Sequence, residues 1–201
     1  MIFEFEKMSP NQRYHLITQT VLPRPIAWIL TANEKDSFNL APFSYFAALS
    51  SEPTLVVVSI GNKEKHLEKD TKANLLREKE CVLHIPSSSN AEDVNTSAAT
   101  LEYGKSEVSE QGLALTPFSQ NLPRLTDTKV AMHCRLYDVH QLSDAQSACY
   151  LEVISVHVED SLINESEGRY YIDSLGLSPL SRLGSADYGI LNEKLTLKRP
   201  S

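Results

Sequence analysis

Short segments dense in β-branched and apolar residues most constrain what this chain can fold into, because such segments are typical of buried strands. Six segments are expected as strands: residues 21–32, 54–60, 80–85, 129–139, 149–158 and 169–172. Helices are expected at residues 71–79, with Asp70 as the N-cap, and at residues 90–100. Because these helices do not alternate with the strands, the pattern predicts a mainly β fold, an antiparallel barrel, in place of a βαβ fold.

Length and charge narrow the class of protein further. The 201 residues indicate one domain over residues 1–201, with a polar, loop-like excursion at residues 102–127. The 19 basic and 26 acidic residues give a net charge of −7, which argues against nucleic acid as a partner. We expect neither a signal peptide nor contact with a membrane, since the longest apolar run covers only residues 55–58.

The sequence excludes several catalytic motifs. Its 7 glycines form neither GxGxxG nor GxxxxGKS/T, and it contains no GxSxG or HExxH. Three histidines, His84, His133 and His157, lie on expected strands; they could converge on a metal, but packed histidines with satisfied hydrogen bonds are the favoured interpretation. The 3 cysteines form no CxxC pair, which indicates reduced, inert thiols and a cytoplasmic protein. We therefore predict no metal site and no catalytic side chain.

The first unusual stretch is residues 23–31, where Pro23 and Pro25 flank Arg24 at the start of a strand. Proline fixes φ and removes an N–H, so the chain here is stiff and its backbone groups can meet a ligand. An edge strand protected against aggregation is the alternative, and this stretch alone leaves both open.

The second stretch, residues 39–46, combines aromatic side chains with a proline and small hydroxyl residues in a turn-like segment. Such a surface suits a flat, mostly apolar ligand whose ring edges need a few hydrogen bonds. A packed bend between strands, with its aromatic side chains in the core, is the alternative.

The third stretch is Lys69, Asp70 and Thr71 at a helix start. The unpaired N–H groups and positive dipole of a helix N-terminus favour anions, so Lys69 and Thr71 could bind a phosphate. Asp70 would repel a phosphate, and it is better interpreted as a cap or as an acceptor for ligand hydroxyls. A plain capped helix is the alternative.

Together these segments resemble the flavin reductase-like, FMN-binding split-barrel family, which includes the flavoredoxins. The likeness is carried by the motifs RPIAWILT, NLAPFSYF, SSEP, LVVVSIG, KDT and ECVLHI in this order, and by C-terminal segments at residues 172–173, 180–184, 187–188 and 197–200. Two departures are SSEP where SSDP is common and a loop at residues 33–38 without the usual glycine. The resemblance implies a Greek-key split barrel with a few short flanking helices, forming a homodimer with FMN near the subunit interface.

The resemblance also implies which residues bind the cofactor. Arg24, Pro25, Ile26, Ala27 and Trp28 would line the flavin; Asn39, Ala41, Pro42, Phe43 and Ser44 would meet the isoalloxazine and ribityl chain; Lys69, Asp70 and Thr71 would lie at the phosphate and ribityl end; and Arg182 and Tyr188 would close the site.

The expected activity is that of an oxidoreductase, an NAD(P)H-dependent flavin reductase. Hydride would pass from C4 of NADH or NADPH to N5 of FMN, a step that requires no side-chain acid or base. Main-chain N–H groups of residues 24–28 and 40–44 would stabilise the reduced flavin, which would then serve a partner oxygenase, an acceptor protein or oxygen. The alternatives are an FMN-bearing electron carrier reduced by a protein partner, and a flavin- or haem-binding module without turnover. No ribose-recognition motif distinguishes NADH from NADPH.

Overall fold

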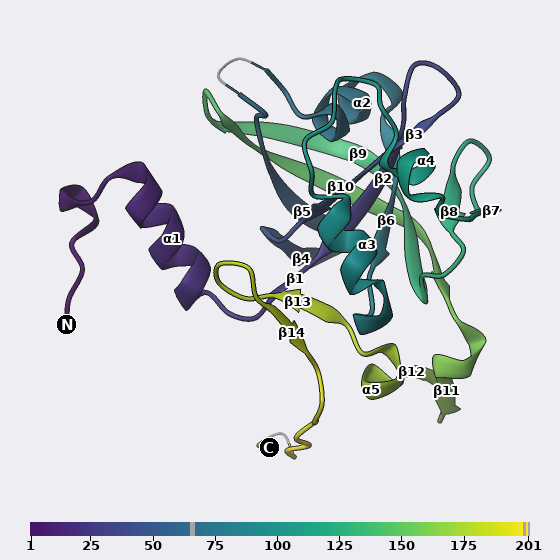
Figure 1. Ribbon diagram of the computed structural model, residues 1–201. Helices are drawn as coiled ribbons and strands as arrows, with labels where there is room; N and C mark the ends of the chain where they lie inside the picture. Colours follow the sequence, from purple (N-terminus) through teal and green to yellow (C-terminus); the bar gives the residue numbers. More distant parts are fainter. Residues whose placement is uncertain (65–66, 199, 201) are drawn as a thin grey trace.

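The computed structural model describes residues 1–64, 67–198 and 200, so Arg199 of the C-terminal motif lies outside the described residues. The body of the protein is a 7-stranded antiparallel sheet in the order β3-β2-β6-β9-β10-β5-β4 (Figure 1). Its strands are β2 (Ala27–Ala32), β3 (Phe38–Phe43), β4 (Phe46–Ser51), β5 (Thr54–Gly61), β6 (Glu80–Ile85), β9 (Val130–Ser143) and β10 (Gln146–Val158).

The sheet is rolled into a barrel that stays open between its two edge strands. β3 and β4 lie at opposite ends of the strand order, yet only Ser44 and Tyr45 separate them in the chain. A connection this short spans roughly 10 Å when fully extended, so the two edges must approach each other there. The expected mainly β split barrel is confirmed.

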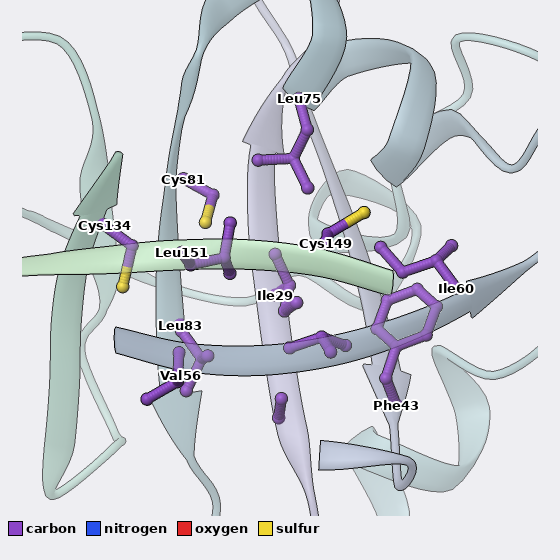
Figure 2. Close-up of a cluster of buried hydrophobic side chains, with 12 residues drawn as sticks. Ile29, Phe43, Val56, Ile60, Leu75, Cys81, Leu83, Cys134, Cys149 and Leu151 are labelled. Atoms are coloured by element: carbon purple, nitrogen blue, oxygen red, sulfur yellow. The ribbon is translucent and has the colours of Figure 1, made fainter. Parts of the chain in front are cut away.

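Two apolar clusters lie on opposite faces of the sheet, because successive side chains of a strand point to opposite faces. On β2, Ala27 and Ile29 join the cluster inside the barrel, which Figure 2 shows with Leu83 and Leu151 from other strands. Trp28 and Leu30 join the outer cluster, which is covered by α3 (Ala91–Thr96), α4 (Glu107–Gln111) and the hairpin of β7 (Leu115–Pro117) and β8 (Pro123–Leu125). β2 is therefore buried on both faces.

The remaining elements lie around the barrel. β1 (Arg24–Pro25) pairs with β13 (Leu180–Arg182), which pairs with β14 (Tyr188–Ile190), and β11 (Ile163–Ser166) pairs with β12 (Arg169–Ile172). The helices are η1 (Phe5–Lys7), α1 (Pro10–Thr20), α2 (Asp70–Glu78), η2 (Ser88–Asn90), η3 (Asp160–Leu162) and α5 (Ser174–Leu177). Figure 1 shows α1 extending to one side of the barrel. None of the helices in the described part of the chain is long and apolar enough to cross a membrane.

Several expectations from the sequence need correction. The segment at residues 39–46, expected to be turn-like, is mostly strand: it contains β3 and the first residue of β4. Residues 102–127 contain α4 and the β7–β8 hairpin, and their apolar side chains, such as Val108 and Leu125, are buried in the outer cluster. The helix expected at residues 90–100 is α3 and ends at Thr96. Asp70 is the first residue of α2 and not its N-cap; Lys69 takes that position without a side-chain capping bond.

Candidate functional site

Two adjoining hollows lie where β3 ends. The first hollow, of about 70 Å³, is lined by Asn39, Ala41, Pro42, Phe43, Lys63, Lys69, Asp70, Thr71, Ser97, Ala98, Ala99, Thr100, Leu101 and Glu107. The second hollow, of about 130 Å³, is lined by Ile26, Pro42, Phe43, Ser44, Val94, Asn95, Ala98, Arg182 and Tyr188. Because Pro42, Phe43 and Ala98 line both, one ligand could extend from one hollow into the other.

The hollows form at this place because β3 is an edge strand. Part of its outer edge is covered: the Leu40 N–H donates to the Glu107 carboxylate at 2.9 Å, and the Ser106 hydroxyl donates to the Phe38 carbonyl at 2.6 Å. The backbone of Pro42, two residues after Leu40, faces the same outer edge of β3. Proline has no N–H, so no unpaired donor is left at this position of the edge. The end of β3 is thus open to a ligand without an orphaned donor at Pro42.

Buried polar side chains hold the start of α2 against β3. Asn39 donates through Nδ2 to the Thr71 hydroxyl at 2.9 Å and to the Thr31 hydroxyl at 3.3 Å. Asn74, one turn further along α2, donates to the same Thr31 hydroxyl at 3.1 Å. Buried hydrogen bonds of this kind are costly to break, so Thr71 has a fixed place in the wall of the first hollow.

The first hollow contains both signs of charge. Lys63 Nζ lies 2.6 Å from Asp70 Oδ1, whereas half-buried Lys69 forms no ion pair with any carboxylate that the structure describes. Burial raises the pKa of the Glu107 carboxyl above its usual range, which the hydrogen bond from Leu40 opposes. A cation, a hydroxyl and the first N–H groups of α2 converge here, and such groups can bind an oxyanion.

The second hollow combines apolar side chains with polar ones and has a cation at its edge. The Arg182 guanidinium lies over the Tyr188 ring, 4.6 Å from its centroid, and donates to the carbonyls of Ser185 and Asp187. The Tyr188 hydroxyl donates to Asn95 Oδ1 at 3.3 Å, which joins the C-terminal hairpin to α3. With Ile26, Phe43 and Val94 as neighbours, this hollow suits a flat, largely apolar group.

Most of the residues expected to bind a cofactor are brought together in these hollows. The first holds Asn39, Ala41, Pro42, Phe43, Lys69, Asp70 and Thr71, and the second adds Ile26, Ser44, Arg182 and Tyr188. Four others lie elsewhere: Pro25 lines a separate apolar groove, Ala27 packs inside the barrel, Trp28 lies in the outer cluster, and Arg24 is buried behind the second hollow. Trp28 nevertheless supports the first hollow, because its Nε1 donates to the hydroxyl of Ser97 at 2.9 Å.

Arg24 joins three segments behind the second hollow. Its Nη1 donates to the carbonyls of Thr18 at 2.5 Å and Val21 at 3.0 Å, at the end of α1. Its Nη2 donates to the Leu183 carbonyl at 2.9 Å, and its Nε donates to the Ser44 hydroxyl at 3.3 Å. The guanidinium therefore donates to carbonyl groups that the end of α1 leaves without a partner in the helix. It also holds the Ser44 side chain at the edge of the second hollow.

Several lining residues were not expected from the sequence. Lys63 follows β5, Glu107 lies in α4, and residues 94–101 form a wall that the chain brings from α3 and the segment after it. The run of small residues from Ser97 to Thr100 is a signal that could have indicated close approach of a ligand. Lys63 and Glu107 carry no local signal, because tertiary packing alone brings them to the hollow.

The histidines have separate partners and do not converge. Burial lowers the pKa of His84 to about 4, so the ring is neutral; its Nδ1 donates to the Trp28 carbonyl, and its Nε2 accepts from the Leu125 N–H, each at 3.0 Å. His133 pairs with Glu80 at 3.0 Å, and His157 meets the edge of Phe118. No group of three metal-ligating side chains occurs within residues 1–64, 67–198 and 200.

The cysteines are free, buried thiols, as expected from their strands. Burial raises the pKa of Cys149 to about 11, so its reactive thiolate is scarce at neutral pH. None of the three cysteines lines either hollow, whose lining supplies hydroxyl, amine, carboxylate and guanidinium groups that can bind a ligand.

The chain is similar in sequence and fold to proteins of one known family. The family described as "Flavin reductase like domain" matches residues 19–174. Nitrilotriacetate monooxygenase component B from Bacillus cereus is 28% identical with a TM-score of 0.89, and covers 98% of each chain. The 2-nitrobenzoate 2-nitroreductase of Pseudomonas fluorescens is 27% identical with a TM-score of 0.89, covering 100% of this chain and 96% of the other. A protein from Shewanella frigidimarina with a split barrel domain, at 18% identity and a TM-score of 0.83 over 100% of both chains, shares the fold.

Proposed function

This chain belongs to the flavin reductase-like domain family, and from this we propose that it is an NAD(P)H-dependent flavin reductase that binds FMN across the two hollows. FMN held there would supply the redox chemistry, hydride transfer from NADH or NADPH to the flavin, while the residues of the two hollows would hold and orient it. The observation that carries the proposal is that two hollows meet at Pro42 and Phe43. One is polar and contains Lys69, which forms no ion pair within the described residues, and the other is lined by Ile26, Phe43 and the Arg182–Tyr188 pair.

The two hollows fit the two ends of FMN. Lys69, Thr71 and the N–H groups at the start of α2 would bind the phosphate, because these groups favour a dianion. Phe43, Ile26 and the Arg182–Tyr188 pair would contact the ring system in the second hollow, and Asn39 would face the ribityl chain between them. Of the main-chain donors expected in residues 40–44, the Leu40 N–H is occupied by Glu107 and Pro42 has none. Ala41 and Phe43 pair with Ile29 and Ala27 of β2, so we assign this role to Ser44.

A homodimer is part of the proposal. An apolar groove of about 490 Å³, lined by residues such as Leu22, Pro25 and Ile190, shares Ile26 with the second hollow. An exposed groove lined by apolar side chains is a feature of surfaces that bind another protein. A second copy seated in this groove would border the second hollow and cover the flavin from outside.

The side chains of this site would bind and orient the cofactor and the nicotinamide. Holding a nicotinamide parallel to an apolar face in the second hollow would supply proximity and alignment, and excluding water would protect the reduced cofactor. Likeness to a monooxygenase component supports a partner oxygenase as the acceptor of the reduced flavin, with an acceptor protein or oxygen as the other routes.

A visible spectrum tests the proposal. The purified protein, alone or with added FMN, is expected to be yellow and to bleach when NADH or NADPH is added without oxygen. Yellow protein that does not bleach would support the electron-carrier alternative, in which a protein partner reduces the flavin. Absence of FMN binding at micromolar concentrations would overturn the assignment and leave a module of another kind.

A further inference from the structure

A carboxylate in the first hollow poses an electrostatic problem for a phosphate. Asp70 begins α2, lines the hollow and is buried, and a buried carboxylate beside a dianion is repelled by it. Its two oxygens, however, are not directed at an empty space. Oδ1 forms an ion pair with Lys63 Nζ at 2.6 Å but accepts no hydrogen bond within the described residues, and Oδ2 accepts from the Gly104 N–H at 3.3 Å.

Lys63 also fixes the opposite wall of the hollow. Its Nζ donates to the Leu101 carbonyl at 3.1 Å, so a single ammonium group contacts both the start of α2 and the segment that follows α3. The side chains of Lys63 and Asp70 are only 11% and 5% exposed, so water and salt screen their interaction weakly. The pair ties Leu101 and Gly104 to the helix start, which gives this wall of the hollow a fixed place.

We propose that Lys63 is a positioning residue for the phosphate of FMN: it neutralises Asp70 and holds residues 101–104 in place. This inference rests on the proposed function and deepens it. With Lys63 present, the charge of Asp70 is compensated. Glu107, the other carboxylate of the hollow, accepts from the Leu40 N–H on the β3 side, and Lys69 is the cation left to meet the phosphate. Without Lys63, the Asp70 charge opposes Lys69, and the hollow loses its preference for a dianion.

Titration of FMN and of riboflavin, which lacks the phosphate, tests the inference in the full-length protein. Lys63→Met is expected to weaken FMN binding about tenfold or more and riboflavin binding less than twofold. Lys63→Arg, which keeps the charge, should retain most of the FMN affinity. The double variant Lys63→Met with Asp70→Asn should recover most of the lost FMN affinity, because the uncompensated carboxylate is gone.

Two results would overturn the inference: equal losses for FMN and riboflavin in Lys63→Met, or a double variant that binds FMN no better than the single one. If Lys63→Met does not fold, the variant Asp70→Asn tests the inference by itself. It leaves the Lys63 ammonium group without its carboxylate partner, which should tighten FMN binding by about two- to fivefold. Weaker FMN binding in that variant would contradict the proposed role. Failure of the wild-type protein to bind FMN would instead refute the proposed function before any variant is compared.

Discussion

The two hollows share three residues but are built in opposite ways. In the first, polar contacts tie the walls together: the Lys63–Asp70 ion pair, the hydrogen bond from Asn39 to Thr71, and the bond from the Leu40 backbone N–H to Glu107. In the second, apolar side chains are closed by a half-buried C-terminal hairpin that carries Arg182 and Tyr188. The end of β3 can thus present an oxyanion site on one side and a site for a flat ring on the other. Substitutions in the two hollows should therefore affect different parts of one ligand.

The support behind the first hollow should be sensitive to acid, and this is the largest effect we expect. His84 donates to the carbonyl of Trp28, whose indole in turn holds Ser97 in the hollow wall. Its pKa of about 4 lies below the roughly 6.5 of an unfolded chain, so the unfolded state binds the proton more tightly. The neutral His84 ring makes its full contribution to the free energy of unfolding above pH 6.5. This contribution is lost as pH falls toward 4, a decrease of about 3 kcal/mol.

Urea unfolding at several pH values measures this loss. His84→Gln is expected to be less stable at pH 7, because hydrogen bonds to Trp28 and Leu125 are disturbed, but to lose less stability between pH 6.5 and 4. His15, which is exposed on α1, provides the matched control, and His15→Gln should keep the wild-type pH dependence. Identical pH slopes for wild type and His84→Gln would show that His84 does not sense pH.

Removing the oxyanion groups of the first hollow should have the next largest effect. Substituting Lys69 and Thr71 together with Ala should weaken FMN binding about 100-fold, because a charge-assisted hydrogen bond and a neutral one are lost. Riboflavin binding should change much less, since it has no phosphate to lose. Lys35→Ala, in an exposed loop outside both hollows, serves as the control for net charge. Equal losses for FMN and riboflavin would refute the placement of the phosphate in this hollow.

Segments with strong local patterns could be predicted from the sequence. The strand expected at residues 80–85 is β6, and the strand expected at residues 169–172 is β12, with identical bounds. β3 and β4 were not expected, because proline, asparagine and small residues interrupt their apolar pattern. α1 was also missed, although Ser9 and Gln12 form a capping box at its start. Few apolar residues follow that signal, so periodicity did not reveal the helix.

The residues of the site divide in the same way, into those with a local sequence pattern and those without one. Contiguous motifs such as residues 39–44 and 69–71 could be singled out locally, whereas Lys63 and Glu107 reach the first hollow only through packing. The role of Asp70 as a cap was wrong for this reason: its carboxylate prefers a tertiary partner, Lys63, to the helix backbone. The missing glycine in the loop at residues 33–38 does have a local explanation, since Asp36 adopts the left-handed conformation with φ of 40°.

The smallest effect we expect comes from Tyr188 in the second hollow, and it tests whether the two hollows bind different parts of FMN. Tyr188→Ala removes the ring on which Arg182 stacks, and should weaken FMN and riboflavin by about the same factor, roughly fivefold, because the ring system is common to both. Tyr188→Phe keeps the stacked ring and loses only the contact with Asn95, so both affinities should stay within about twofold of wild type. A selective loss of FMN binding in Tyr188→Ala would place the phosphate in the second hollow and reverse the assignment of the two sites.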